Sequence, residues 1–214
     1  MRQADILSKN LKGEKGLKSI NEFQQTEKEL KESVRQVIEK LSNKYPELEI
    51  YHKQKYYIKD IVKNFNKKYQ KYNFENINSS SFIKPDGGFI YARKDNKEHI
   101  ICISEMKFQH SKVGNAFERA AKNILVCKNI LSGEKYFPYV LFIQGDVIQA
   151  TNLVDRINSM NYNLPPNKIY VVEKEYDIRP FTIILRDKIS IEMEYEVIKE
   201  ICEESIAYIY NKDK

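Results

Sequence analysis

The sequence lacks the features of a secreted or membrane-spanning protein. Its three cysteines are odd in number and far apart, no CxxC pair occurs, and no signal peptide is recognisable. No apolar run approaches the roughly 18 residues that a membrane span requires. The longest one, residues 136–143, has the length of a buried strand. We therefore expect a chain from a reducing, cytoplasmic compartment, with no membrane partner.

Internal repeats and low-complexity tracts are also absent, and the composition argues against disorder. With 42% hydrophobic and 12% aromatic residues over 214 positions, the chain can bury a substantial core in one domain. The formal net charge of +6 suits a polyanionic partner, but an ordinary solvated surface explains it as well. Residues 1–16 are polar and contain several Lys and Gly residues. We expect them to form a flexible N-terminus of unknown role, and residues 17–214 to form a single domain.

Helical and extended patterns alternate along the chain. A capping-box pattern at residues 19–22 predicts the start of a long helix that ends at 43–46. Further helices are expected at about 114–131, 146–160 and 191–210, and strands at 89–92, 99–107, 138–143, 168–173 and 181–185. This order predicts an α/β fold with a mixed β-sheet flanked by helices. The apolar face of the first helix comprises Leu30, Val34, Val37, Ile38 and Leu41, and that of the second includes Ala120, Ile124, Leu125, Cys127 and Leu131.

Residues 47–74 interleave lysines with tyrosines, and two interpretations stay open. The segment is either a track for a phosphate backbone with aromatic support, or a solvated helix whose apolar residues face inward. We favour the helix for most of the lysines and expect a few of them to contact DNA. The sequence does not say which lysines between residues 52 and 71 do so. The inward residues of such a helix would be Ile58, Ile61, Val62 and Phe65.

The stretch with the clearest chemistry is Pro85-Asp86-Gly87-Gly88, followed one hairpin later by Glu105-Met106-Lys107. Alternate residues of a strand share a face, so Glu105 and Lys107 point the same way. Asp86, at the mouth of the preceding strand, can meet them. Two carboxylates beside an ammonium form a hard-cation site with a positive group aimed at the same phosphate. This layout suits a metal-dependent phosphodiesterase, although the acid-x-Lys triplets at 29–31 and 95–97 show that the triplet alone is a weak signal.

A polar cluster opens the helix expected from residue 114. Asn115, Glu118 and Arg119 lie in its first turn, and Gly114 and Ala116 leave room for close approach. Asn can pair with adenine N6 and N7, a carboxylate can accept from N6, and Arg can donate to a purine N7. A capping Asn beside a surface Glu–Arg pair explains the same residues, and on this segment alone we favour that interpretation.

Four motifs, in order, resemble the EcoRI-like type II restriction endonucleases of the PD-(D/E)xK nuclease superfamily. They are residues 80–88, 105–109, 114–119 and 137–142. Weaker similarity is found at residues 41–46, 155–156 and 161–162. Four ordered motifs are far more specific than one triplet, and the resemblance covers roughly residues 35–175. It favours base recognition over simple capping for the cluster at 114–119.

The resemblance implies a restriction-endonuclease-like core and a homodimer that uses Mg²⁺ to cut both strands of double-stranded DNA. The site would be a palindrome with an AATT core, cut to leave 5′ overhangs, and each protomer would read one half-site. A DNA methyltransferase would be the functional counterpart in a restriction–modification system. The resemblance assigns metal binding to Asp86 and Glu105, positioning of the attacking water to Lys107, and base recognition to Asn115, Glu118 and Arg119, with Gly114 and Ala116 beside them.

Two departures from the family leave the base pairs flanking AATT open. Only residues 108–113 separate Lys107 from Gly114, where longer members carry an insert that includes a DNA-wrapping arm. Leu153 and Val113 stand where members of the family place arginines. Gln109 and Arg156 remain as candidates for contact with the outer pair. We favour a relaxed site, AATT alone or with a degenerate flank, over a strict six-base-pair site, and methylation sensitivity is not indicated.

Two other functions stay open on the sequence. A repair or junction-resolving nuclease on the same scaffold would recognise DNA structure rather than sequence, and the cluster of Asn115, Glu118 and Arg119 speaks against it. A catalytically inactive DNA-binding protein would have no need of an intact Asp86, Glu105 and Lys107.

Overall fold

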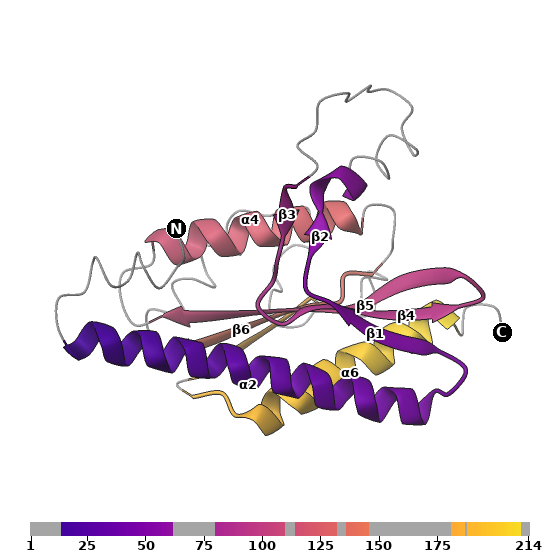
Figure 1. The fold of residues 1–214 in the computed structure, drawn as a ribbon, viewed down its shortest axis with the longest axis horizontal. Helices are drawn as coiled ribbons and strands as arrows, with labels where there is room; N and C mark the ends of the chain where they lie inside the picture. The colour runs from indigo at the N-terminus through magenta and orange to yellow at the C-terminus, as the bar shows by residue number, and fades with distance from the viewer. Residues whose placement is uncertain are drawn as a thin grey trace.

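The described part of the chain has three layers, with a five-stranded sheet between helices (Figure 1). Helix α4 (Gly114–Ile130) covers one face of the sheet, and helices α2 (Glu14–Lys44) and α6 (Ile191–Tyr210) cover the other. The computed structural model describes residues 14–61, 80–109, 114–131, 136–145, 181–186 and 188–210. Within these ranges, the side chains of residues 14–23, 109, 114–117 and 181 are not described. The expected α/β fold with a mixed sheet flanked by helices is confirmed.

The sheet has the order β1-β4-β5-β6-β7 and combines antiparallel with parallel pairing. Strands β1 and β5 each pair antiparallel with β4, whereas β6 pairs parallel with β5 and β7 pairs parallel with β6. The central strand β5 is therefore paired on both sides, which holds its residues rigidly. The bounds are Glu49–Lys53 for β1, Gly88–Lys94 for β4, Lys97–Gln109 for β5, Tyr139–Gly145 for β6 and Phe181–Arg186 for β7.

The hairpin of β4 and β5 is built from a tight turn and a bulge. Asp95 and Asn96 form the turn with positive φ angles of 49° and 62°, a conformation that Asp and Asn tolerate better than other non-glycine residues. The register shifts between Ile90 and Tyr91, so that Ile101 is an extra residue on β5. The bulge changes the phase of side-chain alternation along β5, so that Ile103, Glu105 and Lys107 face α4 while Met106 faces α2 and α6.

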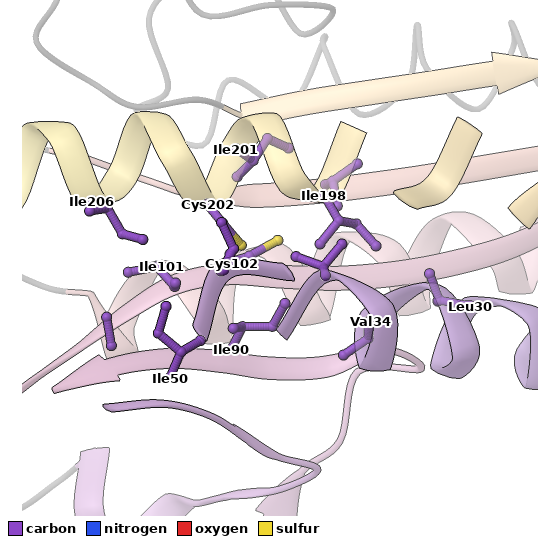
Figure 2. Close-up of a cluster of buried hydrophobic side chains, with 14 of the residues drawn as sticks. Leu30, Val34, Ile50, Ile90, Ile101, Cys102, Ile198, Ile201, Cys202 and Ile206 are labelled. Carbon is purple, nitrogen blue, oxygen red and sulfur yellow. The ribbon is translucent and has the colours of Figure 1, made fainter. Parts of the chain in front are cut away.

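The layer between the sheet and helices α2 and α6 forms one hydrophobic core (Figure 2). The expected face of α2 is buried, with Leu30, Val37 and Leu41 at 0% exposure and Ile38 partly buried. Each such side chain contributes about 1.5–3 kcal/mol through apolar burial. The three cysteines are free and buried, and Cys102 of β5 lies beside Cys202 of α6 in this layer. Among the described helices, none has both the length and the apolar character to cross a bilayer.

A second core lies between the sheet and α4. Ala120, Ile124 and Cys127 of α4 are fully buried against residues such as Ile103 and Leu141 of the sheet. The prediction that Leu125 faces inward is wrong, because this side chain is 42% exposed. It directly follows Ile124, so the helical rotation of about 100° per residue moves it off the apolar stripe.

The helix that we favoured for residues 47–74 is wrong for residues 49–57. They form β1 and the short strand β2 (Tyr56–Tyr57), which pairs with β3 (Phe82–Ile83). In β1, Ile50 is buried opposite Ala92, and this pairing with a distant segment outweighs local helical preference. Only residues 58–61 are helical in the described part of this segment, so Val62 and Phe65 lie outside it.

The ends of the predicted elements agree with the structure in most places. Helix α2 ends at Lys44 as expected, but it begins at Glu14, so Ser19 lies inside the helix and does not cap it. The strands predicted at 89–92, 99–107, 138–143 and 181–185 and the helices at 114–131 and 191–210 are confirmed. The helix predicted at 146–160 and the strand at 168–173 lie outside the described residues.

Candidate active site

Asp86 is held by a tight turn that leads from β3 into β4. The amide of Gly88 donates to the carbonyl of Pro85 at 3.1 Å, and the amide of Gly87 donates to the carbonyl of Ser104 at 3.0 Å. Gly88 has a φ of +74°, and a Cβ there would lie 2.3 Å from Nε2 of His52. A Cβ on Gly87 would lie 2.1 Å from the Oγ of Ser104. Both glycines are therefore needed for the turn to pack against β1 and β5.

The turn brings Asp86 against Glu105 through a reciprocal pair of hydrogen bonds. The amide of Asp86 donates to Oε2 of Glu105 at 3.0 Å, and the amide of Met106 donates to Oδ2 of Asp86 at 3.1 Å. Nζ of Lys107 lies 3.7 Å from Oδ2 of Asp86 and forms an ion pair with Oε1 of Glu105. The structure thus brings together the three residues that strand alternation places near one another.

Burial and charge set the protonation of this group. Burial raises the pKa of Asp86 to about 6, with a further contribution from the Glu105 carboxylate, while Lys107 and the Met106 amide act in the opposite direction. Burial alone would lower the pKa of Lys107, but Glu105 and Asp86 outweigh it, and the pKa is raised above its usual value. Lys107 therefore carries a full positive charge, and with both carboxylates ionised the group has a net charge of about −1.

These residues provide a donor set that fits Mg²⁺. Among the described residues, no group of three His, Cys, Asp or Glu side chains is placed to hold a metal ion, so an all-protein cage is not formed there. Mg²⁺ typically binds through one or two carboxylates, with water and phosphate oxygens completing its shell. Asp86 and Glu105 supply such a pair. Burial first and the Glu105 charge second raise the pKa of Asp86, and a divalent cation would offset both effects.

Known proteins with similar sequences share this region. The sequence profile of the family described as "Restriction endonuclease EcoRI" matches residues 14–114, a range that contains Asp86, Glu105 and Lys107. The type II restriction enzyme EcoRI of Escherichia coli is 27% identical over 150 residues, which cover 50% of this chain and 54% of that enzyme. The type II restriction enzyme RsrI of Cereibacter sphaeroides is 33% identical over 87 residues, 31% of each chain.

The chain is thus similar to the EcoRI-like restriction endonucleases over part of its length, and the family profile covers just under half of it. The aligned part spans about half of the length of one of these relatives and about a third of the other. The family match ends at Gly114, the first residue of α4.

Two residues of the candidate site were missed by the sequence analysis. Nδ2 of Asn123, on α4, donates to Oε1 of Glu105 at 2.7 Å. Nε2 of His52, on β1, lies 2.9 Å from the carbonyl oxygen of Gly87, which requires that Nε2 carry the proton. Burial lowers the pKa of His52, which favours the neutral ring. One sequence signal for Asn123 existed, since it follows Asn115 and Arg119 at successive four-residue intervals on one helix face.

The carboxylates lie at the floor of a cleft with a cationic rim. The cleft has a volume of about 680 Å³ and is lined by residues of β3, the turn after it, β5 and α4, including Lys84, Arg119 and Lys122. Within the described part of the chain, no carboxylate forms an ion pair with these three cations. Some cations elsewhere are paired with carboxylates, such as Arg35 with Glu32 and Lys44 with Glu203.

The predicted base-recognition residues lie at the start of α4. Arg119 lines the cleft, and Glu118 is exposed beside it. Gly114, Asn115 and Ala116 form the first turn of the same helix, with side chains outside the described set. Gln109 ends β5 opposite Gly145. Arg156, Leu153 and Val113 lie outside the described residues, so the roles of this group stay predictions.

Proposed function

We propose that this chain is a type II restriction endonuclease that cuts both strands of duplex DNA at a palindrome with an AATT core. The reaction would be Mg²⁺-dependent hydrolysis of phosphodiester bonds and would leave 5′ overhangs. The observation that carries the proposal is the grouping of Asp86, Glu105 and Lys107 on the floor of a cation-rimmed cleft, within the part of the chain that matches the EcoRI family profile.

In this proposal Asp86 and Glu105 hold Mg²⁺ at the phosphate that is cut. When bound, the ion would supply Lewis-acid polarisation of the phosphate and a more acidic water. The Lys107 ammonium lies 3.7 Å from Oδ2 of Asp86 and keeps its proton. It therefore orients the attacking water and offsets the negative charge that develops on the phosphate oxygens. Because Lys107 is only 12% exposed, its charge acts in a weakly screened environment.

The described cations suggest where the DNA backbone would lie. Lys84, Arg119 and Lys122 on the rim are free of carboxylate partners in the described part and are available to phosphates. The ribbon of β2 and β3 adds Lys55, with its Nζ 4.2 Å from the centre of the Phe82 ring, and Lys59, with its Nζ 5.4 Å from that of Tyr57. Both rings are exposed.

Of the lysines between residues 52 and 71, we propose Lys55 and Lys59 as the phosphate contacts. By contrast, Lys53 pairs with Glu98. Its charge is neutralised within the protein, and we assign it a structural role.

Base recognition is proposed for the first turns of α4. Asn115, Glu118 and Arg119 have the donors and acceptors that read adenine and its neighbours in the major groove, and Arg119 shares the cleft with the catalytic floor. A homodimer places two such helices on a palindrome by twofold symmetry. Gln109 and Arg156 are the candidates for the outer pair, and we propose a relaxed flank. A DNA methyltransferase would protect the host sites.

The test is digestion of plasmid DNA by the purified protein with Mg²⁺, followed by run-off sequencing of the products. We expect cuts at a fixed position relative to AATT on both strands, with 5′ overhangs, and none when EDTA replaces Mg²⁺. Asp86→Ala serves as the inactive control against contaminating nuclease. Cutting without sequence preference would instead support a structure-selective nuclease. Tight AATT binding without cutting would support a DNA-binding protein.

A further inference from the structure

Glu105 is clamped by protein donors at both of its carboxylate oxygens. Oε2 accepts from the amide of Asp86, and Oε1 accepts from both Lys107 and Asn123. The residue is only 2% exposed, so these partners replace water almost completely. Asn123 is the one contributor to this clamp that comes from α4, the helix that also carries Arg119.

We propose that Asn123 is a positioning residue that holds the Glu105 carboxylate in the orientation needed to bind a divalent cation. The inference rests on the proposed function for its catalytic meaning, but its metal-binding part can be measured separately. Its basis is the 2.7 Å hydrogen bond from Nδ2 of Asn123 to Oε1 of Glu105. Partners of metal ligands fix the orientation of the ligand, and their loss typically costs about 10–100-fold in metal affinity or activity.

The chemistry of the two donors to Oε1 explains why an amide is suited to this position. The Lys107 ammonium neutralises Glu105 when the two pair, and that pairing competes with binding of a cation. The Asn123 amide donates a hydrogen bond without bringing charge, so the carboxylate keeps its attraction for a metal ion. When Lys107 turns to a phosphate, Asn123 still holds Oε1 in place.

The hydrogen bond is not needed to dock α4 onto the sheet. Ala120, Ile124 and Cys127 are fully buried on either side of Asn123 and supply apolar packing. The hydrogen bond from Asn123 to Glu105 is one polar contact beside this apolar packing. A merely structural role therefore predicts a loss of stability with unchanged metal affinity. A positioning role predicts a clear loss of metal affinity with little change in stability.

The experiment compares Asn123→Ala with Asn123→Gln, which keeps an amide donor, and with Asn129→Ala, an exposed asparagine on the same helix. The first readout is Mn²⁺ affinity of the DNA-free protein, from the electron paramagnetic resonance signal of free Mn²⁺. We expect N123A to bind Mn²⁺ about tenfold or more weakly, N129A to match the wild type, and N123Q to recover part of the loss. The second readout is the single-turnover cleavage rate as a function of Mg²⁺ concentration, where N123A should need more Mg²⁺.

The outcomes separate this inference from the proposed function. If the wild type cuts DNA and N123A matches N129A in Mn²⁺ affinity and in Mg²⁺ dependence, the positioning role is overturned and the proposed function stands. If the wild type does not cut DNA but N123A still binds Mn²⁺ more weakly than N129A, the proposed function fails and the positioning role stands. Equal loss in N123A and N123Q, accompanied by a lower Tm in both, would also overturn it in favour of a structural role.

Discussion

Glu194, on the inner side of α6, offers a test of the packing that supports the sheet. Its side chain accepts a hydrogen bond from the Oγ of Ser33 on α2 at 2.8 Å, and its other oxygen has no partner among the described residues. The residue is 1% exposed. Burial raises the pKa of Glu194 to about 7, the Ser33 hydrogen bond acts in the opposite direction, and Glu29 adds a smaller rise. The perturbation that we propose is Glu194→Gln.

The sign of the effect follows from proton linkage. The folded state binds the Glu194 proton up to about pH 7, whereas the unfolded chain releases it near the ordinary glutamate pKa of 4.5. Stability from this residue is therefore present at low pH and is lost as the pH rises from about 4.5 through 7. At about 1.36 kcal/mol per pKa unit, a rise of about 2.5 units corresponds to a full loss on the order of 3 kcal/mol. The glutamine side chain of the E194Q variant cannot ionise, so the variant should lack this loss.

The assay is thermal or urea unfolding of wild type and E194Q between pH 5 and pH 8.5. The wild type should lose about 2–3 kcal/mol relative to E194Q over this range, or roughly 4–12 °C in Tm at 2–4 °C per kcal/mol. Using the difference between the two proteins cancels other titrating groups, including Asp86. Glu200→Gln, an exposed change on the same helix, should leave the pH profile unaltered. Parallel pH profiles for wild type and E194Q would refute the reasoning.

Three further predictions concern DNA cleavage. Asp86→Ala and Glu105→Ala should abolish cleavage of plasmid DNA without unfolding the protein, and Lys107→Ala should do nearly the same. A near wild-type cleavage rate for either carboxylate variant would remove the metal-site assignment. Asn115→Ala, Glu118→Ala and Arg119→Ala should each lose about 1–3 kcal/mol of base discrimination and hence cleavage at AATT sites, with Mn²⁺ binding unchanged; normal rates in all three would show that the reading helix is misplaced. Duplexes that differ only in the pair flanking AATT should be cut at similar rates, and a preference of about a hundredfold, the size of a good bidentate contact, would refute the relaxed site and direct attention to Arg156→Ala and Gln109→Ala.

The sequence predicted those parts of the fold and site that depend on local periodicity. Alternation along a strand places Glu105 and Lys107 on one face, and the helical spacing of Leu30, Val37 and Leu41 places them in the core. These features need only neighbours in the chain. They could therefore be inferred without knowledge of the tertiary structure.

Features that depend on distant segments were missed. Residues 49–53 became a strand because β4 offers an edge to pair with, about forty residues along the chain. Asn123 reaches Glu105 only after α4 has packed on the sheet. Leu125 was placed wrongly because it lies next to the apolar face of α4 in sequence. Only the packing of α4 on the sheet shows that it lies outside that face. In each case tertiary contact overrides or completes the local signal.

The bulge in β5 decides whether a site can form at all. Ile100 and Ile103 both pack in the core on the α4 side, although strict alternation would place residues three apart on opposite faces. The extra residue Ile101 removes the conflict, and it faces the α2 and α6 core together with Cys102. If Ile101 were an ordinary paired residue instead of a bulge, the alternation set at Ile100 would turn Glu105 and Lys107 toward α2 and α6, away from the cleft and Asn123. The hydrophobic pattern of the hairpin is thus not enough to form the site. The position of one bulge decides which face of the sheet carries Glu105 and Lys107.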